Sequence, residues 1–366
     1  MNKLKSLTIR GFRSIESLEE FEPGDVCVLI GANGAGKSNF VEFFRMVRRI
    51  ADQSLQKYLL ETASDALFYF GPPRATEIAV RLELADVVLS FELHPRAGGG
   101  AFVNDASIAR KRSDSTSPER VVLRAAGEIS IDAIEIAGQS VKVHEELYSA
   151  VSSWNVYHVH DTSLYAPLRG WGSSSNNVRL AADASNLAAV LLGLRHEDAH
   201  SYAGIRDTVR LAAPFFDDFV LRPRMRGREE QVRLEWTQRG SQEPFQPTVL
   251  SDGTLRFIAL ITALLQPSPP STIVIDEPEL GLHPSAIMLL GEAIRAASKR
   301  TQVIVATQSP LLLDCFDAGE VVVVERESGR SVFRRLDAQQ LTSWLEDYSL
   351  GELWLKNLLG GRPGRD

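Results

Sequence analysis

The sequence has little cysteine and no long apolar run. Cys27 and Cys315 are its only cysteines in 366 residues. Both lie among apolar neighbours, so we expect buried reduced thiols rather than a disulfide, as is usual in the cytoplasm. No apolar stretch is long enough to cross a bilayer, and the first residues lead directly into an amphipathic strand without the features of a signal peptide. These absences predict a cytoplasmic protein that does not span a membrane.

The sequence also lacks an excess of basic residues, an internal repeat and a sustained heptad pattern. Its 47 acidic residues outnumber 40 basic ones, which gives a net charge of −7. The protein as a whole is therefore not a general polyanion binder. Without heptads, a long coiled coil is excluded. The hydrophobic content of 44% is typical of a globular chain with a large core.

The most specific motif that is present covers residues 31–38. Its sequence, Gly-Ala-Asn-Gly-Ala-Gly-Lys-Ser, fits the phosphate-loop pattern. The apolar run 26–30 precedes it, and apolar residues with helical spacing follow at 40, 43, 44 and 47. This context predicts a strand, a loop and a helix. An ordinary glycine-rich turn is the alternative.

A phosphate loop wraps nucleotide phosphates with backbone N–H groups at the positive end of the following helix. Lys37 is predicted to reach the β- and γ-phosphates, and Ser38 to bind magnesium. The predicted nucleotide-binding residues of this loop are Asn33, Gly34, Gly36, Lys37 and Ser38.

A second motif ends an apolar, β-branched run. Residues 271–275 are typical of a buried parallel strand, and Asp276 and Glu277 follow it. Asp276 is predicted to hold magnesium, directly or through water. Glu277 is predicted to orient and polarise the attacking water. The alternative is a strand capped by acids at a solvated edge, but the phosphate loop upstream favours the catalytic interpretation.

A third motif, Leu-Ser-Asp-Gly-Thr at residues 250–254, opens an apolar helical stretch that extends to Leu265. Ser251 or Asp252 can cap this helix, and a small glycine-containing loop at a helix N-terminus binds anions. Because the phosphate loop already provides one such site, Ser251 and Gly253 are predicted to bind the γ-phosphate of ATP on a partner subunit. A plain capped helix is the alternative.

These motifs, with residues 4–15, 277–279, 282–284 and 308–310, resemble the ABC-type ATPases of the RecF, SMC and overcoming-lysogenisation-defect group, especially its compact members. The resemblance implies an α/β fold of the P-loop NTPase class: an ABC-type ATPase head with two lobes and no long coiled coil. We expect an N-terminal lobe at 1–140, and a helical region with the second lobe at 141–366. The resemblance also implies ATP and Mg²⁺ as cofactors and a homodimer that closes around ATP.

Further residues acquire roles through this resemblance. Gln308 follows an apolar strand at the position where ABC-type ATPases have a γ-phosphate sensor, usually histidine. Glutamine can hydrogen-bond a phosphate but carries no positive charge, so Gln308 is expected to sense the phosphate rather than transfer a proton. A polar strand end without nucleotide contact is the alternative. The loop at Arg13 and Ser14 lies near the nucleotide in relatives.

The resemblance implies ATP hydrolysis by a dimer that regulates a separate effector, a nuclease or a toxin, in antiphage defence. The chain shows no long arm, membrane span or nuclease site that would perform such a task itself. The apolar stretch 350–359 could dock the effector through Trp354, unless that side chain packs onto its own core. The alternatives are a DNA repair or recombination ATPase acting directly on DNA, and a nucleotide-gated scaffold with little turnover.

Contact with DNA is a further possibility because arginines alternate in one segment. On an extended strand they would line one face and could contact a phosphate backbone. Pro223 and Gly227 favour an edge strand or a loop, and the acidic residues at 229–230 leave solvated charge as the alternative. The four arginines are Arg222, Arg224, Arg226 and Arg228.

Overall fold

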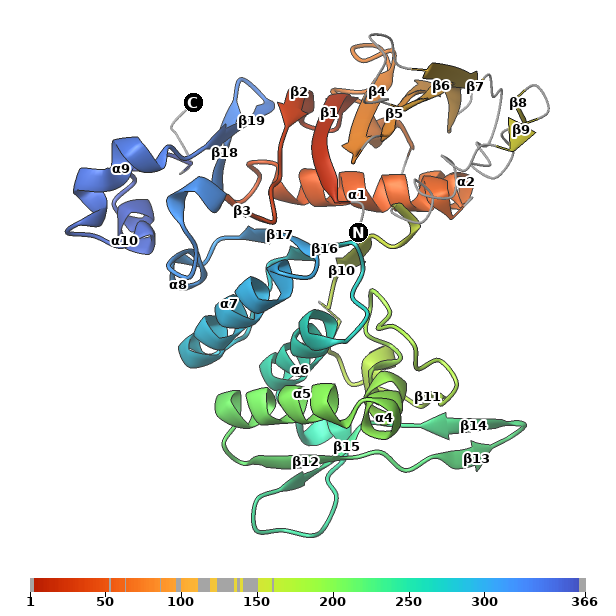
Figure 1. Cartoon of the computed structure of the whole chain (residues 1–366), viewed down its shortest axis with the longest axis vertical. Helices are drawn as coiled ribbons and strands as arrows, with labels where there is room; N and C mark the ends of the chain where they lie inside the picture. Colours follow the sequence, from red (N-terminus) through yellow and green to blue (C-terminus); the bar gives the residue numbers. More distant parts are fainter. Residues whose placement is uncertain are drawn as a thin grey trace.

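The computed structural model describes residues 3–361, except residues 53, 63, 86, 97–99, 111–118, 124–134, 137–138, 141–150 and 160. Figure 1 shows helix α1 lying between an antiparallel sheet and a mostly parallel central sheet, with helices α4 to α7 on the other side of the central sheet. The chain is therefore an α/β protein, as the sequence predicted.

The central sheet holds the predicted buried strands. Its first five strands run parallel, and the last pair, β18–β19, is antiparallel. Parallel strands end at one common edge, so the loops that follow β3, β16 and β17 meet there. In spatial order the strands are β10 (Asn155–Tyr157), β16 (Thr272–Asp276), β17 (Gln302–Thr307), β3 (Val26–Ile30), β18 (Val321–Glu327) and β19 (Arg330–Arg335).

The second large sheet is antiparallel and covers the opposite side of α1 (Figure 1). Apolar and polar residues alternate along one of its strands, β4, and the large apolar ones are buried. In spatial order it contains β2 (Ile15–Phe21), β1 (Leu4–Phe12), β4 (Ile78–Leu84), β5 (Val87–Pro95), β6 (Ala101–Arg110) and β7 (Glu119–Leu123). A separate short pair is formed by β8 (Glu135–Ile136) and β9 (Gln139–Ser140).

Two hydrophobic cores lie on the two faces of the central sheet. Val26 and Val28 of β3 face the core that is shared with the helices after residue 186. Cys27 and Leu29 alternate with them and face the core that contains α1 and the antiparallel sheet. Both faces are thus buried, which explains the continuous apolar run of this strand.

Of the two cap candidates at 251–252, Ser251 is the N-cap of α6, and Asn186 is the N-cap of α4. The helices are α1 (Lys37–Ala51), α2 (Leu55–Glu61), α4 (Leu187–Glu197), α5 (Ala199–Ala212), α6 (Asp252–Leu265), α7 (Pro284–Ser298), α8 (Pro310–Leu313), α9 (Ala338–Leu345) and α10 (Leu350–Leu355). None of the helices in the described part of the chain has the length and hydropathy needed to cross a membrane.

Two small sheets lie beyond α4 and α5. One pairs β12 (Phe216–Val220) with β15 (Glu235–Gln238), and the other has the order β11 (Gly172–Ser173), β14 (Glu229–Val232) and β13 (Arg224–Arg226). Strand β13, which carries part of the arginine segment, is an edge strand, as Pro223 and Gly227 predicted.

The two cysteines differ in burial. Both are free, but only Cys27 is buried; Cys315 is partly exposed, so the expectation of two buried thiols is wrong for Cys315. Burial raises the pKa of the Cys27 thiol to about 12.

The lobe boundary near residue 140 stays a prediction. Strand β3, from the N-terminal part, lies in one sheet with strands from the C-terminal part.

Candidate nucleotide site

The predicted phosphate loop connects β3 to α1 at the carboxyl edge of the central sheet. Gly34 and Gly36 have φ angles of +80° and +114°, which side chains of L residues rarely adopt. A Cβ atom on Gly36 would lie 1.9 Å from the Ser331 hydroxyl, so only glycine fits there. Asn33, Gly34 and Ser38 are exposed, which leaves the concave loop accessible to a ligand.

Lys37 is the first residue of α1, and it is buried. Its Nζ atom donates to the carbonyl oxygens of Gly31, at 2.7 Å, and Ala32, at 3.1 Å. Burial lowers the pKa of Lys37, and the nearby carboxylates, Glu277 first among them, act in the opposite direction. The ammonium group therefore lies beside the acidic residues that follow β16, where phosphate oxygens would become its stronger partners.

Glu277 has a strained backbone at the end of β16. Its φ of +46° is a left-handed conformation that costs a non-glycine residue about 1–3 kcal/mol. The conformation is held by a hydrogen bond of 2.7 Å from the Glu277 N–H to the carbonyl of Ala306 in β17. Strain of this kind is common at active sites.

The structure brings the two predicted catalytic residues together. Gln308 Nε2 donates to Glu277 Oε1 at 2.6 Å, and the Gln308 backbone N–H donates to Glu279 Oε1 at 2.8 Å. Gln308 is thus fixed by two carboxylates at the end of β17. Its side-chain amide can orient the Glu277 carboxylate and leaves its carbonyl oxygen for a water molecule.

The acidic residues around this edge fit a magnesium ion. Glu279 Oε2 is buried and has no hydrogen-bond partner within the described residues. Such a carboxylate oxygen is costly unless water or a cation satisfies it. Asp276 at the strand end and the exposed hydroxyl of Ser38 add oxygen ligands of the kind that Mg²⁺ prefers. The sequence analysis did not predict a role for Glu279. Its position two residues after Glu277 could have indicated a third carboxylate near the site.

The third predicted motif, residues 250–254, lies at the N-terminus of α6, and we call it the signature segment. Ser251 caps α6: its Oγ accepts from the Thr254 N–H at 3.1 Å, and its side chain is exposed. A Cβ atom on Gly253 would lie 2.0 Å from the carbonyl oxygen of Gly281, so α6 packs directly on the loop after β16. No hydrogen bond within the described residues joins Ser251 or Gly253 to the phosphate loop of the same chain.

A cavity of about 320 Å³ opens beside the phosphate loop. Two of its residues, Arg13 and Phe70, have left-handed φ angles of +50° and +51°. The Arg74 guanidinium lies 5.3 Å from the centre of the Phe70 ring. The polar and aromatic lining of this cavity suits a nucleoside. The lining residues are Arg13, Ser14, Asn39, Ala66, Phe68, Phe70, Gly71, Arg326 and Gly329.

Arg13 and Ser14 were expected near the nucleotide from the resemblance, but Phe70 and Arg326 were not. Arg326 donates to the carbonyl of Gly34 at 3.3 Å, and Asn39 donates to the Ser14 hydroxyl at 2.6 Å. Because these residues come from segments far apart in the chain, no local pattern could have grouped them.

Comparisons with known proteins give a family and a set of similar folds. A family model described as "AAA domain, putative AbiEii toxin, Type IV TA system" matches residues 26–314. No curated protein matches the sequence. Among solved structures, the chain is similar to the Smc head domain with an extended coiled coil bound to the C-terminal domain of ScpA from Pyrococcus furiosus. The identity is 13%, the TM-score is 0.58, and the alignment covers 95% of this chain and 99% of the other.

Two more solved structures are similar at a comparable level. An Smc head bound to the C-terminal winged-helix domain of ScpA has 14% identity and a TM-score of 0.56, with 93% of this chain and 99% of that chain covered. The Smc head domain with a coiled coil and joint from Pyrococcus yayanosii has 12% identity and a TM-score of 0.55, with 95% and 99% covered. At these identities the likeness shows the fold.

Proposed function

The chain belongs to the family of AAA domains described as putative AbiEii toxin, type IV TA system, and on that premise we propose that it hydrolyses ATP to control a separate effector. Its fold is that of the SMC-head ATPases. The observation that carries the proposal is the 2.6 Å hydrogen bond between Gln308 and Glu277. This bond assembles a candidate general base beside a phosphate loop with a buried lysine.

In the proposed reaction the loop holds the phosphates, and Lys37 binds the β- and γ-phosphates. Ser38 and Asp276 would hold Mg²⁺, which neutralises charge on the phosphates when bound. Glu277 accepts a hydrogen bond from the attacking water and polarises it. Gln308 keeps Glu277 oriented, and because its amide is neutral it takes no proton.

We propose that the ATP site is completed by a second copy of the chain. Ser251 and Gly253 lie at the N-terminus of α6, whose backbone N–H groups favour an anion. Since nothing in the described hydrogen bonding joins them to their own phosphate loop, their natural ligand is the γ-phosphate on the partner. Two chains in this arrangement form a symmetric, head-to-tail homodimer with two ATP sites.

Mixing two inactive variants tests this arrangement. Lys37→Ala and Ser251→Arg should each lose ATP turnover as homodimers. A mixed dimer keeps one site with an intact Lys37 and an intact Ser251. Random mixing should therefore restore about a quarter of wild-type phosphate release, because half of the dimers are mixed and each has one good site.

The matched control is the double variant Lys37→Ala/Ser251→Arg, mixed with either single variant. These mixtures contain no intact site, so they should stay inactive. Size-exclusion chromatography with light scattering verifies assembly. If the single variants assemble together and no phosphate release is recovered, the proposal that two chains share each ATP site is wrong. Turnover must then occur within one chain.

We further propose that a toxin or nuclease docks on this ATPase in antiphage defence within the cytoplasm. The family description names a toxin system, and the head in one similar structure is bound to a domain of another protein, ScpA. Of the two alternatives for Trp354, packing onto its own core holds, because its side chain is only 7% exposed and lies in the core. Exposed apolar side chains are offered instead by Trp344 and Leu345 of α9 and by Leu355 and Leu358.

Purification together with the products of neighbouring genes tests the effector. We expect one product to co-purify, and cells carrying both genes to survive phage challenge better than cells carrying a Lys37→Ala version. The variant Trp344→Glu should reduce co-purification without changing ATP turnover. The control Met288→Glu replaces an exposed apolar residue on α7 and should leave co-purification unchanged. If no product co-purifies, no protection appears and DNA ends alone stimulate turnover, the DNA repair alternative holds.

A further inference from the structure

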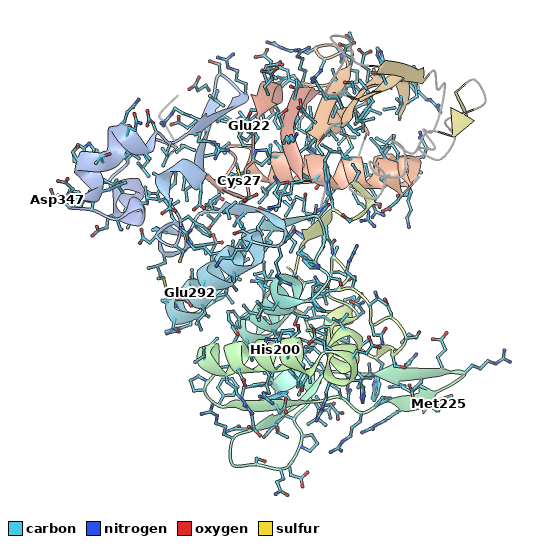
Figure 2. All side chains as sticks on the ribbon, viewed as in Figure 1. Glu22, Cys27, His200, Met225, Glu292 and Asp347 are labelled. Atoms are coloured by element: carbon cyan, nitrogen blue, oxygen red, sulfur yellow. The ribbon has the colours of Figure 1, made fainter. Side chains whose placement is uncertain are left out.

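A two-stranded hairpin, β13–β14, extends away from helices α4 and α5 (Figure 1). Its two-residue turn contains Gly227 with a φ of +69°. Residues 222–230 are all exposed, and Met225, labelled on this hairpin in Figure 2, is 70% exposed. We call residues 222–233 the basic hairpin. Its basic residues are all arginines: Arg222, Arg224, Arg226, Arg228 and Arg233.

Three of these arginines converge on one indole ring. The guanidinium carbons of Arg224, Arg226 and Arg233 lie 5.5, 4.7 and 4.8 Å from the centre of the Trp171 ring. Arg233 is paired with Glu235 at 3.0 Å, yet its buried Nε has no hydrogen-bond partner. Over the part of the chain that the structure describes, no carboxylate forms an ion pair with Arg224 or Arg226. Like charges gathered in this way repel one another and favour a bound anion.

We propose that the basic hairpin binds duplex DNA. A two-stranded β-ribbon has the width that the major groove of B-form DNA admits. Arg224 and Arg226 lie on the same face of β13, about 6.6 Å apart along the strand. Their planar guanidinium groups can each bind a backbone phosphate with two parallel hydrogen bonds. The major groove of A-form RNA is too deep and narrow for such a ribbon.

The hairpin is connected to the signature segment by a short chain of contacts. Strand β11 begins directly after Trp171 and pairs with β14, with Gly172 opposite Val232. Two residues before Trp171, the buried Arg169 side chain donates to Asp252 at 2.7 Å and to the carbonyl of Leu250 at 3.3 Å. A continuous set of contacts therefore joins the basic hairpin to the residues around Ser251.

This link gives DNA a way to act on nucleotide binding, a step that rests on the proposed function of the signature segment. DNA on the basic hairpin stabilises the position of Arg169, and with it the segment that closes on the partner's ATP. By linkage, DNA then tightens ATP binding and ATP tightens DNA binding by the same factor.

Fluorescence anisotropy with a short labelled DNA duplex tests the DNA site, and it requires no ATP turnover. The variant Arg224→Gln/Arg226→Gln should bind about tenfold or more weakly. The slope of log affinity against log salt should fall by about 1.8, because two phosphate contacts are lost. The control Arg239→Gln/Lys299→Gln removes two exposed charges elsewhere and should bind as the wild type does.

Competition identifies the ligand class. Duplex RNA of the same sequence, single-stranded DNA and polyglutamate should each compete less well than duplex DNA. Equal competition by any of them, or equal DNA affinity of the hairpin variant and the wild type, overturns the proposal.

The connection to the ATP site is measured with a fluorescent ATP analogue. Duplex DNA should tighten its binding by about fivefold or more in the wild type and not in the hairpin variant. Because binding is measured, a chain that fails to hydrolyse ATP still gives an answer. Unchanged analogue affinity in a DNA-saturated wild type overturns the connection to the signature segment.

Discussion

Replacing Lys37 with alanine is expected to abolish ATP binding. The buried ammonium group of Lys37 donates to the carbonyl oxygens of Gly31 and Ala32. When ATP binds, phosphate oxygens would replace these carbonyls as its hydrogen-bond acceptors. A hydrogen bond to a charged group contributes about 1.5–3 kcal/mol. Losing two of them weakens binding by about a hundredfold or more, and phosphate release falls with it.

Binding of a fluorescent ATP analogue and thermal unfolding give independent measurements. MgATP at a hundredfold excess over Kd should stabilise the wild type by about 2.7 kcal/mol and leave Lys37→Ala unchanged. The same substitution at the exposed Lys356, on the surface of the C-terminal region, is the matched control and should behave as the wild type. If Lys37→Ala binds the analogue with wild-type affinity, the phosphate-loop assignment fails.

Replacing Glu277 with glutamine is expected to preserve ATP binding and to reduce turnover by about 10²–10⁴, the usual contribution of a general base. Glutamine has nearly the same shape, so the strained loop after β16 can keep its backbone. Its amide cannot accept the proton of the attacking water. It also changes the partner of Gln308 Nε2, which donates to the Glu277 carboxylate.

Two measurements separate the chemical step from nucleotide binding: phosphate release in a single turnover, and the affinity for the fluorescent ATP analogue. ATP should persist on the Glu277→Gln chain, and ATP-dependent dimers should accumulate because the nucleotide that closes them is not consumed. Glu292→Gln, an exposed carboxylate on α7, is the control. Wild-type turnover by Glu277→Gln would show that another residue activates the water. Very slow turnover by the wild type itself would favour the nucleotide-gated scaffold.

The sequence by itself determined the local parts of the candidate site. Gly34 and Gly36 were recognisable from the phosphate-loop pattern, and both adopt positive φ angles that favour glycine. At Gly36 a Cβ atom would also meet Ser331. The apolar runs before residues 31 and 276 became parallel strands because both of their faces are buried. Ser251 was recognisable as a helix cap because its hydroxyl satisfies a free N–H within one turn. Each of these signals acts over a few residues.

Tertiary structure alone decided which of these parts meet. Gln308 contacts Glu277 because β16 and β17 are neighbours in the central sheet, and strand order depends on the burial of whole faces. The cavity formed by Arg13, Phe70 and Arg326 likewise gathers distant segments.

Tertiary packing also determined which side chains are buried and which groups they contact. Trp354, which the sequence offered as a docking anchor, fills its own core. Trp171, which no motif marked, lies under the arginines of an edge hairpin. A residue's type and spacing define what it can do, whereas the long-range packing of sheets and helices defines which groups it faces.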